Sequence, residues 1–76
     1  MTLKNLKPGQ EGTVVSIGEK GASRRRIMDM GVTPGAIVKV IKVAPLGDPI
    51  EINIRGYELS LRKDEAAQIQ IALSSN

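Results

Sequence analysis

The chain has 76 residues, with 11 lysines and arginines against 8 aspartates and glutamates, so its net charge at pH 7 is +3. It contains no cysteine and no histidine, which excludes a disulfide framework and removes the usual zinc ligands. Tyrosine occurs once and is the only aromatic residue, which argues against surfaces that stack bases or grip proline-rich peptides. We therefore expect one domain, residues 1–76, with an aliphatic core and no bound metal or cofactor.

The first predicted strand follows a turn. Pro8-Gly9 is a turn signal, and the β-branched run over residues 13–17 comes shortly after it.

A short helix is predicted next, over residues 24–30, with Ser23 as N-cap and Gly31 just beyond the C-terminal end. Its first turn holds the three arginines of residues 24–26, where the helix dipole disfavours each cation by about 0.3–1 kcal/mol. Asp29 can offset part of this cost by pairing with an arginine three or four residues earlier. Because stability alone would not select this arrangement, we interpret the helix as a docking element.

The apolar residues of this helix have different expected roles. Ile27 and Met30 are three positions apart and share a face, which we expect to cover the open end of the sheet. Met28 is rotated by about 100° from Ile27 and is expected to stay partly exposed. The alternative is that all three are ordinary core residues.

A second turn, Pro34-Gly35, precedes a second β-branched run over residues 37–43. The segment APLGDP, residues 44–49, follows it. Two prolines and a Gly-Asp pair stiffen this loop and place Leu46 at its tip. The leucine either packs against the domain or is presented to a partner, and the sequence leaves both open.

Strict alternation of apolar and polar residues over 50–54 and again over 57–61 predicts two strands with one buried face each. Arg55 and Gly56 between them fit a two-residue hairpin turn. The same alternation places Tyr57 on the buried face.

The end of the chain is predicted to hold a helical turn with Asp64 as N-cap, a last strand over residues 69–73, and a frayed tail at 74–76. Five short strands in so few residues favour a small closed or nearly closed barrel, because closure removes exposed edges.

Catalysis is poorly supported, because no histidine or cysteine is present and no serine has a visible base beside it. The start, MTLKNLKPGQ, lacks the apolar core of a signal peptide, and no apolar run is long enough to cross a bilayer. We expect a cytoplasmic, non-enzymatic protein without direct membrane insertion.

The chain resembles the FeoA family of small cytoplasmic proteins that accompany the bacterial ferrous-iron transporter FeoB. The shared pieces are a basic, apolar helix ending in Met-Gly, then TPG, VAPLGDPIEI and RGYELSLRK, from about residue 7 to the last strand. The resemblance implies an SH3-like β-barrel with a helical insertion, a fold also found as the C-terminal domain of iron-dependent repressors. It further implies an accessory or regulatory role in ferrous-iron uptake, exerted through the cytoplasmic part of FeoB.

We predict that this role is carried by protein–protein contact rather than by chemistry. One alternative is that an arginine modulates GTP hydrolysis by FeoB; another is a nucleic-acid-binding module, favoured by the arginine run and not expected here. Pairing of two copies stays open. The predicted partner-binding residues are Arg24, Arg25, Arg26, Ile27, Met28, Met30 and Leu46.

Overall fold

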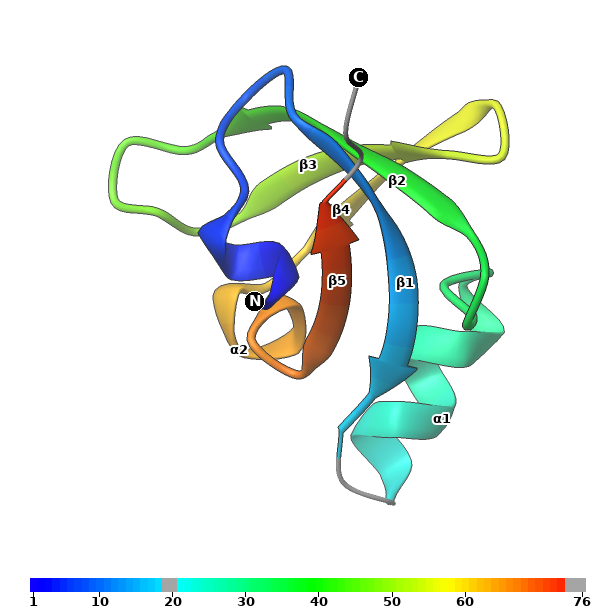
Figure 1. The fold of residues 1–76 in the computed structure, drawn as a ribbon. Coiled ribbons are helices and arrows are strands. Elements are labelled where there is room, and N and C mark those ends of the chain that lie inside the picture. The colour runs from blue at the N-terminus through cyan, green and yellow to red at the C-terminus, as the bar shows by residue number, and fades with distance from the viewer. Residues whose placement is uncertain (19–20, 74–76) are drawn as a thin grey trace.

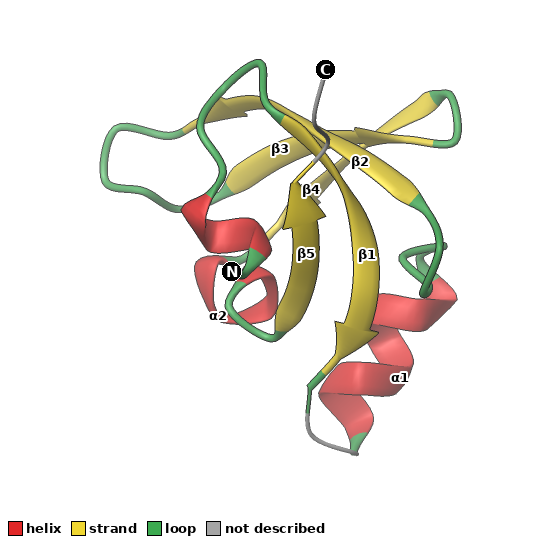
Figure 2. Cartoon of the chain, in the orientation of Figure 1, coloured by secondary structure: helices red, strands yellow, loops and turns green. Residues whose placement is uncertain are grey.

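The computed structural model describes residues 1–18 and 21–73, so the tail predicted at 74–76 lies outside the described residues. Five strands, two short α-helices and one 3₁₀ helix follow one another along the chain (Figures 1 and 2). They are η1 (Leu3–Asn5), β1 (Glu11–Ile17), α1 (Ala22–Asp29), β2 (Ile37–Val43), β3 (Ile50–Ile54), β4 (Tyr57–Leu61), α2 (Lys63–Ala66) and β5 (Ile69–Leu73).

The strands form a single antiparallel sheet in the order β4-β3-β2-β1-β5. The sheet curls so that β1 and β5 lie on one side and β3 and β4 cross behind them (Figure 1). Register shifts in β1 and β2 interrupt the ladders where the sheet bends, as bulges do. The predicted mainly-β architecture is confirmed, with one helix after the first strand and a helical turn before the last.

The core lies inside this curled sheet and is aliphatic throughout. In β3 the predicted alternation is confirmed, because Ile52 and Ile54 are fully buried while Asn53 is not. The N-terminal segment also contributes, since Leu3 in η1 and Leu6 just after it are buried. The sequence analysis missed η1, although a leucine pair at i,i+3 is a helical signal.

The hairpin between β3 and β4 turns on two residues, as predicted. Arg55 and Gly56 have φ angles of 51° and 87°, which is the pattern of a type I′ turn. The prediction that Tyr57 is buried is wrong, because its exposed fraction is 50%. The alternation does put Tyr57 on the inward side, but this end of the hairpin projects past the barrel (Figure 1), where there is little core to cover a ring.

Gly12 marks the closest approach between β1 and β5. A Cβ atom at this position would collide with the Ile71 side chain and lie 2.9 Å from the backbone oxygen of Ala72. Because backbone atoms cannot move aside cheaply, we expect Gly12→Ala to lower the free energy of unfolding by about 1–3 kcal/mol. Chemical denaturation measures this loss. Gly18→Ala is the control: its nearest contact would be 3.3 Å, and an equal or larger loss there would contradict the account.

Candidate protein-docking site

Helix α1 (Ala22–Asp29) begins two residues before the predicted start at residue 24. Gly21 precedes the helix with a φ of 140°, a conformation that residues with a Cβ atom rarely adopt. The prediction that Ser23 is the N-cap is therefore wrong, and Ser23 lies inside α1. The C-terminal prediction is confirmed: Met30 is the C-cap and Gly31 follows it with a φ of 96°.

Two apolar side chains, Ile27 and the partly buried Met28, and two polar contacts hold α1 against the end of the barrel. Ile27 is the only residue of the helix that is fully buried. The amide of Gln68 donates a hydrogen bond of 3.2 Å to Ser23 Oγ, and Arg26 Nε lies 3.4 Å from Glu65 Oε2. These contacts fix the side of α1 that faces the domain, so the opposite side is left to solvent.

Glu65 is the buried carboxylate in this arrangement, with an exposed fraction of 6%. Its Oε1 accepts a hydrogen bond of 2.9 Å from the backbone N–H of Arg62, while Oε2 faces Arg26. The prediction that Asp64 caps α2 is therefore wrong, because Arg62 occupies the cap position and Glu65 reaches back to it. Glu65 thus ties α1, α2 and the end of β4 together.

The two partners of Glu65 should contribute unequally to stability. The side chain of Arg26 is 59% exposed, and ion pairs of this kind contribute roughly 0–1 kcal/mol. Loss of a charged acceptor from a backbone N–H costs about 1.5–3 kcal/mol. We therefore expect Glu65→Ala to destabilise the domain clearly and Glu65→Gln, which keeps an acceptor oxygen, to do so by less than half as much. Equal losses in a denaturant titration would contradict this ranking.

The solvent side of α1 carries a shallow hollow of about 450 Å³, which we call the α1 hollow. Gly21, Arg24, Arg25, Met28 and Asp29 line it. Within residues 1–18 and 21–73, neither arginine forms an ion pair. The predicted pairing of Asp29 with Arg25 or Arg26 is also absent from that part of the chain, because Arg26 turns to Glu65 instead.

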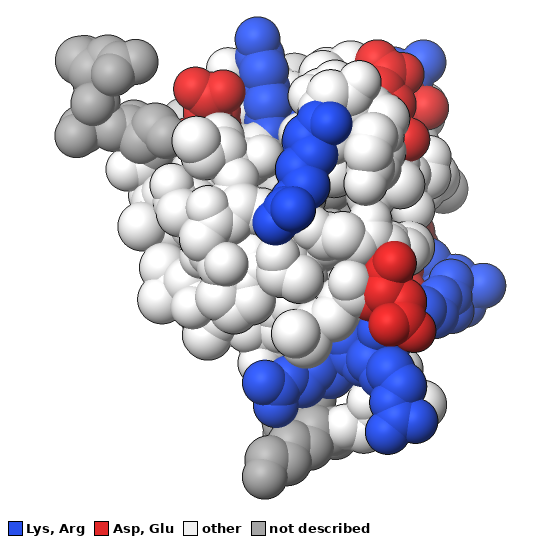
Figure 3. Space-filling view, turned by 90° about the vertical axis from the view of Figure 1, so that its right-hand side faces the viewer, with Lys and Arg blue, Asp and Glu red and all other residues white. Residues whose placement is uncertain are grey.

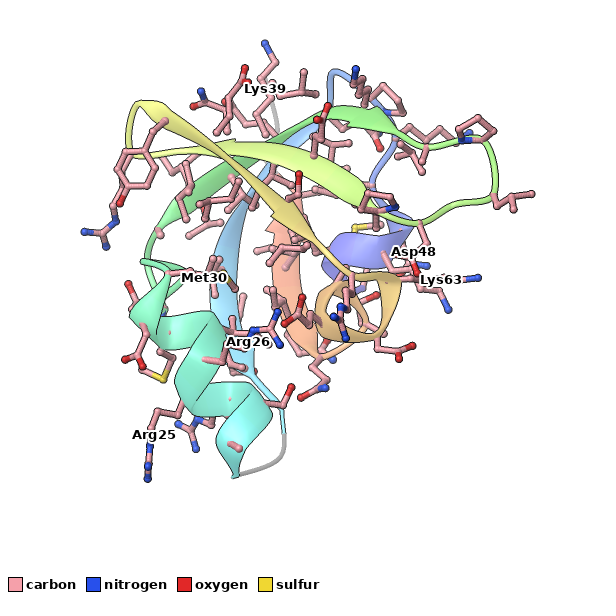
Figure 4. All side chains as sticks on the ribbon, turned by 180° about the vertical axis from the view of Figure 1, so that it is seen from behind. Arg25, Arg26, Met30, Lys39, Asp48 and Lys63 are labelled. Carbon is pink, nitrogen blue, oxygen red and sulfur yellow. The ribbon has the colours of Figure 1, made fainter. Side chains whose placement is uncertain are left out.

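The arginines of α1 therefore point in different directions. In Figure 4, Arg25 extends away from the barrel, whereas Arg26 lies on the side facing α2. Figure 3 shows basic side chains gathered around the α1 end, below a broad surface with few charges. The α1 hollow thus combines an apolar floor at Met28 with cations at its rim, which suits a partner that offers both an apolar group and carboxylates.

The residues predicted to bind a partner do not form one surface. Arg24, Arg25 and Met28 meet in the α1 hollow. Ile27 is fully buried, so it cannot contact a partner directly. Met28 and Met30 are both partly buried and both pack against the core.

Leu46 has an exposed fraction of 91%, so it does not pack against the domain. Its loop, residues 44–49, lies across the molecule from α1 (Figure 1).

Sequence reasoning missed Gly21 and Asp29 as lining residues and Glu65 and Gln68 as the groups that orient α1. Only Glu65 carried a signal, because a glutamate three residues after the helix-capping residue Arg62 fits a capping box. The contacts of Gln68 with α1 join residues 45 positions apart, and no local pattern encodes them.

Two chemical properties of the described residues bear on function. No group of three or more His, Cys, Asp or Glu side chains within residues 1–18 and 21–73 is placed to hold a metal ion. Across the same ranges, the helices are too short or too polar to span a bilayer. The α1 hollow remains the feature with the clearest chemical character.

Comparison with known proteins places these features in a family. The FeoA domain profile matches residues 1–73. A fusion protein of Porphyromonas gingivalis, Fe(2+) transport protein A/Fe(2+) transporter FeoB, is 37% identical over 76 residues. That alignment covers 100% of this chain and 9% of the relative, so this chain spans a small part of the relative's length.

Solved structures of FeoA proteins have a similar fold. The FeoA protein of Chlorobium tepidum, determined by solution NMR, has a TM-score of 0.90 and 44% identity, covering 99% of this chain and 71% of that one. The zinc-complexed FeoA of Stenotrophomonas maltophilia, described as a procaryotic SH3 domain protein, has a TM-score of 0.83 and 25% identity, covering 95% and 89% of the two chains. The predicted SH3-like fold is therefore confirmed.

Proposed function

This chain belongs to the FeoA domain family, and we propose that it is a non-enzymatic, cytoplasmic accessory protein of ferrous-iron transport that binds the cytoplasmic region of a FeoB-type transporter. The fusion of the two units in one Porphyromonas gingivalis protein supports this association. Covalent linkage raises the effective concentration of one unit beside the other, so a fusion is advantageous where the units act in contact.

The α1 hollow is the surface that we assign to this contact. The observation that carries the assignment is the pair Arg24 and Arg25, which lie beside Met28 without an ion-pair partner in the described part of the chain. Arg24 lies in the first turn of α1, where a cation costs helix stability, whereas Arg26 lies in the last turn and pairs with Glu65 inside the domain. A complementary acidic surface on the transporter would give Arg24 and Arg25 a function.

This arrangement implies a definite dependence on salt. Charges at the rim of an interface mainly raise the association rate, and exposed charges are screened beyond about 8 Å at physiological ionic strength. An interface with Met28 at its centre and two arginines around it should therefore lose association rate as salt rises. Its dissociation rate should change less.

The test is a titration of the whole chain with the purified cytoplasmic region of the FeoB-type transporter from the same genome, followed by calorimetry and by surface-based kinetics. We expect saturable 1:1 binding, with an association rate that falls at least threefold between about 50 and 300 mM salt. Absence of binding at the lowest salt would refute the proposal.

A second candidate function is modulation of GTP hydrolysis. Arg25 is exposed, points away from the barrel and has no ion pair within the described ranges, as required of an arginine supplied in trans to a nucleotide site. GTPase rates with and without a saturating amount of this chain test it. Acceleration that is lost in an Arg25→Lys variant supports a guanidinium at the phosphate, and unchanged rates with the wild type exclude it.

The exposure of Tyr57 removes one argument against nucleic-acid binding, since its ring is not in the core. A single ring is still no stacking platform. A fluorescence titration with a labelled single-stranded RNA at about 50 mM salt is expected to show no saturation. Tight binding that falls steeply with salt would favour the nucleic-acid module instead.

A further inference from the structure

Leu46 is presented on a loop whose backbone is fixed. Across residues 44–49, the N–H of Gly47 donates to Ala44 O at 2.7 Å, and the N–H of Ala44 donates to Pro49 O at 3.0 Å. Asp48 anchors the loop to α2, because its Oδ1 accepts a 3.0 Å hydrogen bond from the N–H of Lys63 (Figure 4). Burial of this leucine by a partner would therefore cost little backbone ordering.

The rest of the same molecule supplies a matching receptor. The α1 hollow is shallow and partly open to solvent, with Met28 in its lining and about 450 Å³ of space. Methionine adapts its shape to an incoming apolar group. The loop and α1 lie on opposite sides of the domain (Figures 1 and 4), so no molecule can fill its own hollow.

Charge supports the same pairing. Asp48 is exposed and lies two residues beyond Leu46, so its Oδ2, the carboxylate oxygen that does not accept the bond from Lys63, would arrive at the hollow together with the leucine. Arg24 and Arg25 line the hollow, and Asp29 is the one acidic residue in the lining. Two cations against one anion leave the rim positive, which complements the single carboxylate of the loop, Asp48.

We propose that Leu46 of one copy inserts into the α1 hollow of a second copy, with Asp48 beside Arg24 and Arg25. Such a contact is heterologous, because different surfaces of the two copies meet. Each dimer keeps one free loop and one free hollow, so association continues head-to-tail into short chains or a ring. The inference rests on the two surfaces of this chain and not on the proposed binding to the transporter.

The experiment is sedimentation velocity of the full chain from about 10 µM to 1 mM at low salt. We expect the weight-average mass of the wild type to rise with concentration, and the Leu46→Ser and Met28→Asp variants each to remain monomeric. Circular dichroism confirms that the variants are folded, and Arg24→Glu, which alters no apolar contact of the core, serves as a second hollow variant. A monomeric wild type throughout the range would overturn the proposal.

The decisive experiment mixes the Leu46→Ser and Met28→Asp variants. Leu46→Ser keeps an intact hollow and Met28→Asp keeps an intact loop, so the mixture is expected to form a heterodimer and to stop there. A mixture that stays monomeric, or a single variant that still associates, contradicts the head-to-tail contact. Binding of Leu46→Ser to the transporter's cytoplasmic region, measured in parallel, shows whether the function proposed above stands independently.

Discussion

An Arg24→Glu variant is expected to bind the cytoplasmic region of the FeoB-type transporter at least tenfold more weakly than the wild type, a loss of about 1.4 kcal/mol or more. Arg24 lines the α1 hollow beside Met28. The substitution replaces a cation by an anion where we place the acidic surface of the partner, so attraction becomes repulsion. Calorimetric titration at low salt measures the change.

The same variant is expected to be more stable than the wild type. Arg24 is the third residue of α1, where a cation opposes the helix dipole and a glutamate complements it. Removal of that conflict should raise the free energy of unfolding by about 0.3–1 kcal/mol. Opposite signs for binding and stability would show that the arginine is retained for contact with a partner.

Lys4→Glu is the matched control, because it makes the same change in net charge on an exposed residue of η1. η1 lies beside α2, away from α1 (Figure 1), so transporter binding should stay within twofold of the wild type. Equal weakening by Lys4→Glu and Arg24→Glu would mean that only net charge matters. That outcome would remove the case for the α1 hollow.

Ile27→Ala is expected to be among the most destabilising substitutions in the chain. Ile27 is the fully buried residue of α1 and its main core contact, beside the partly buried Met28. Truncation of a buried isoleucine to alanine costs about 2–5 kcal/mol, because apolar contacts are lost and a cavity remains. Alanine's better helix propensity offsets less than about 0.7 kcal/mol of this. Denaturant unfolding followed by circular dichroism measures the net loss.

Ile27→Val is the conservative comparison, and its free energy of unfolding is expected to fall by about 0.5–1.5 kcal/mol. A loss below 1 kcal/mol for Ile27→Ala would mean that α1 is not seated through this residue. A large loss for Ile27→Ala would also mean that a charged residue at position 27 cannot be used to test docking, because it would unfold α1. Substitutions at Arg24 and Arg25 test docking without that complication.

Much of the fold could be predicted because its signals are local. Alternation set the inward faces of β3 and β4, and the Arg55-Gly56 pair fixed the hairpin. Alternation alone could not predict that Tyr57 is half exposed. A period of two tells which side of a strand a residue faces, but not whether the rest of the domain extends far enough to cover it.

The candidate site was predicted in part. Its local features could be predicted from the sequence, whereas its long-range contacts could not. The prediction that all three arginines oppose the helix dipole is wrong for Arg26, because α1 begins at Ala22 and Arg26 falls in its last turn; the opposition holds for Arg24, the third residue of the helix. The partner of Arg26 is Glu65, 39 positions further along the chain, and the pair forms only after α1 and α2 pack on the same end of the barrel. Sequence patterns therefore could not separate Arg26 from Arg24 and Arg25.

The most direct test of the account is a map of backbone amide chemical shifts in the ¹⁵N-labelled chain during titration with the transporter's cytoplasmic region. The account predicts that the largest changes fall on residues 21–29, the segment that contains every residue lining the α1 hollow, with little change in β3 and β4. Binding whose largest changes fall on the outer face of the sheet, with α1 unaffected, would contradict it.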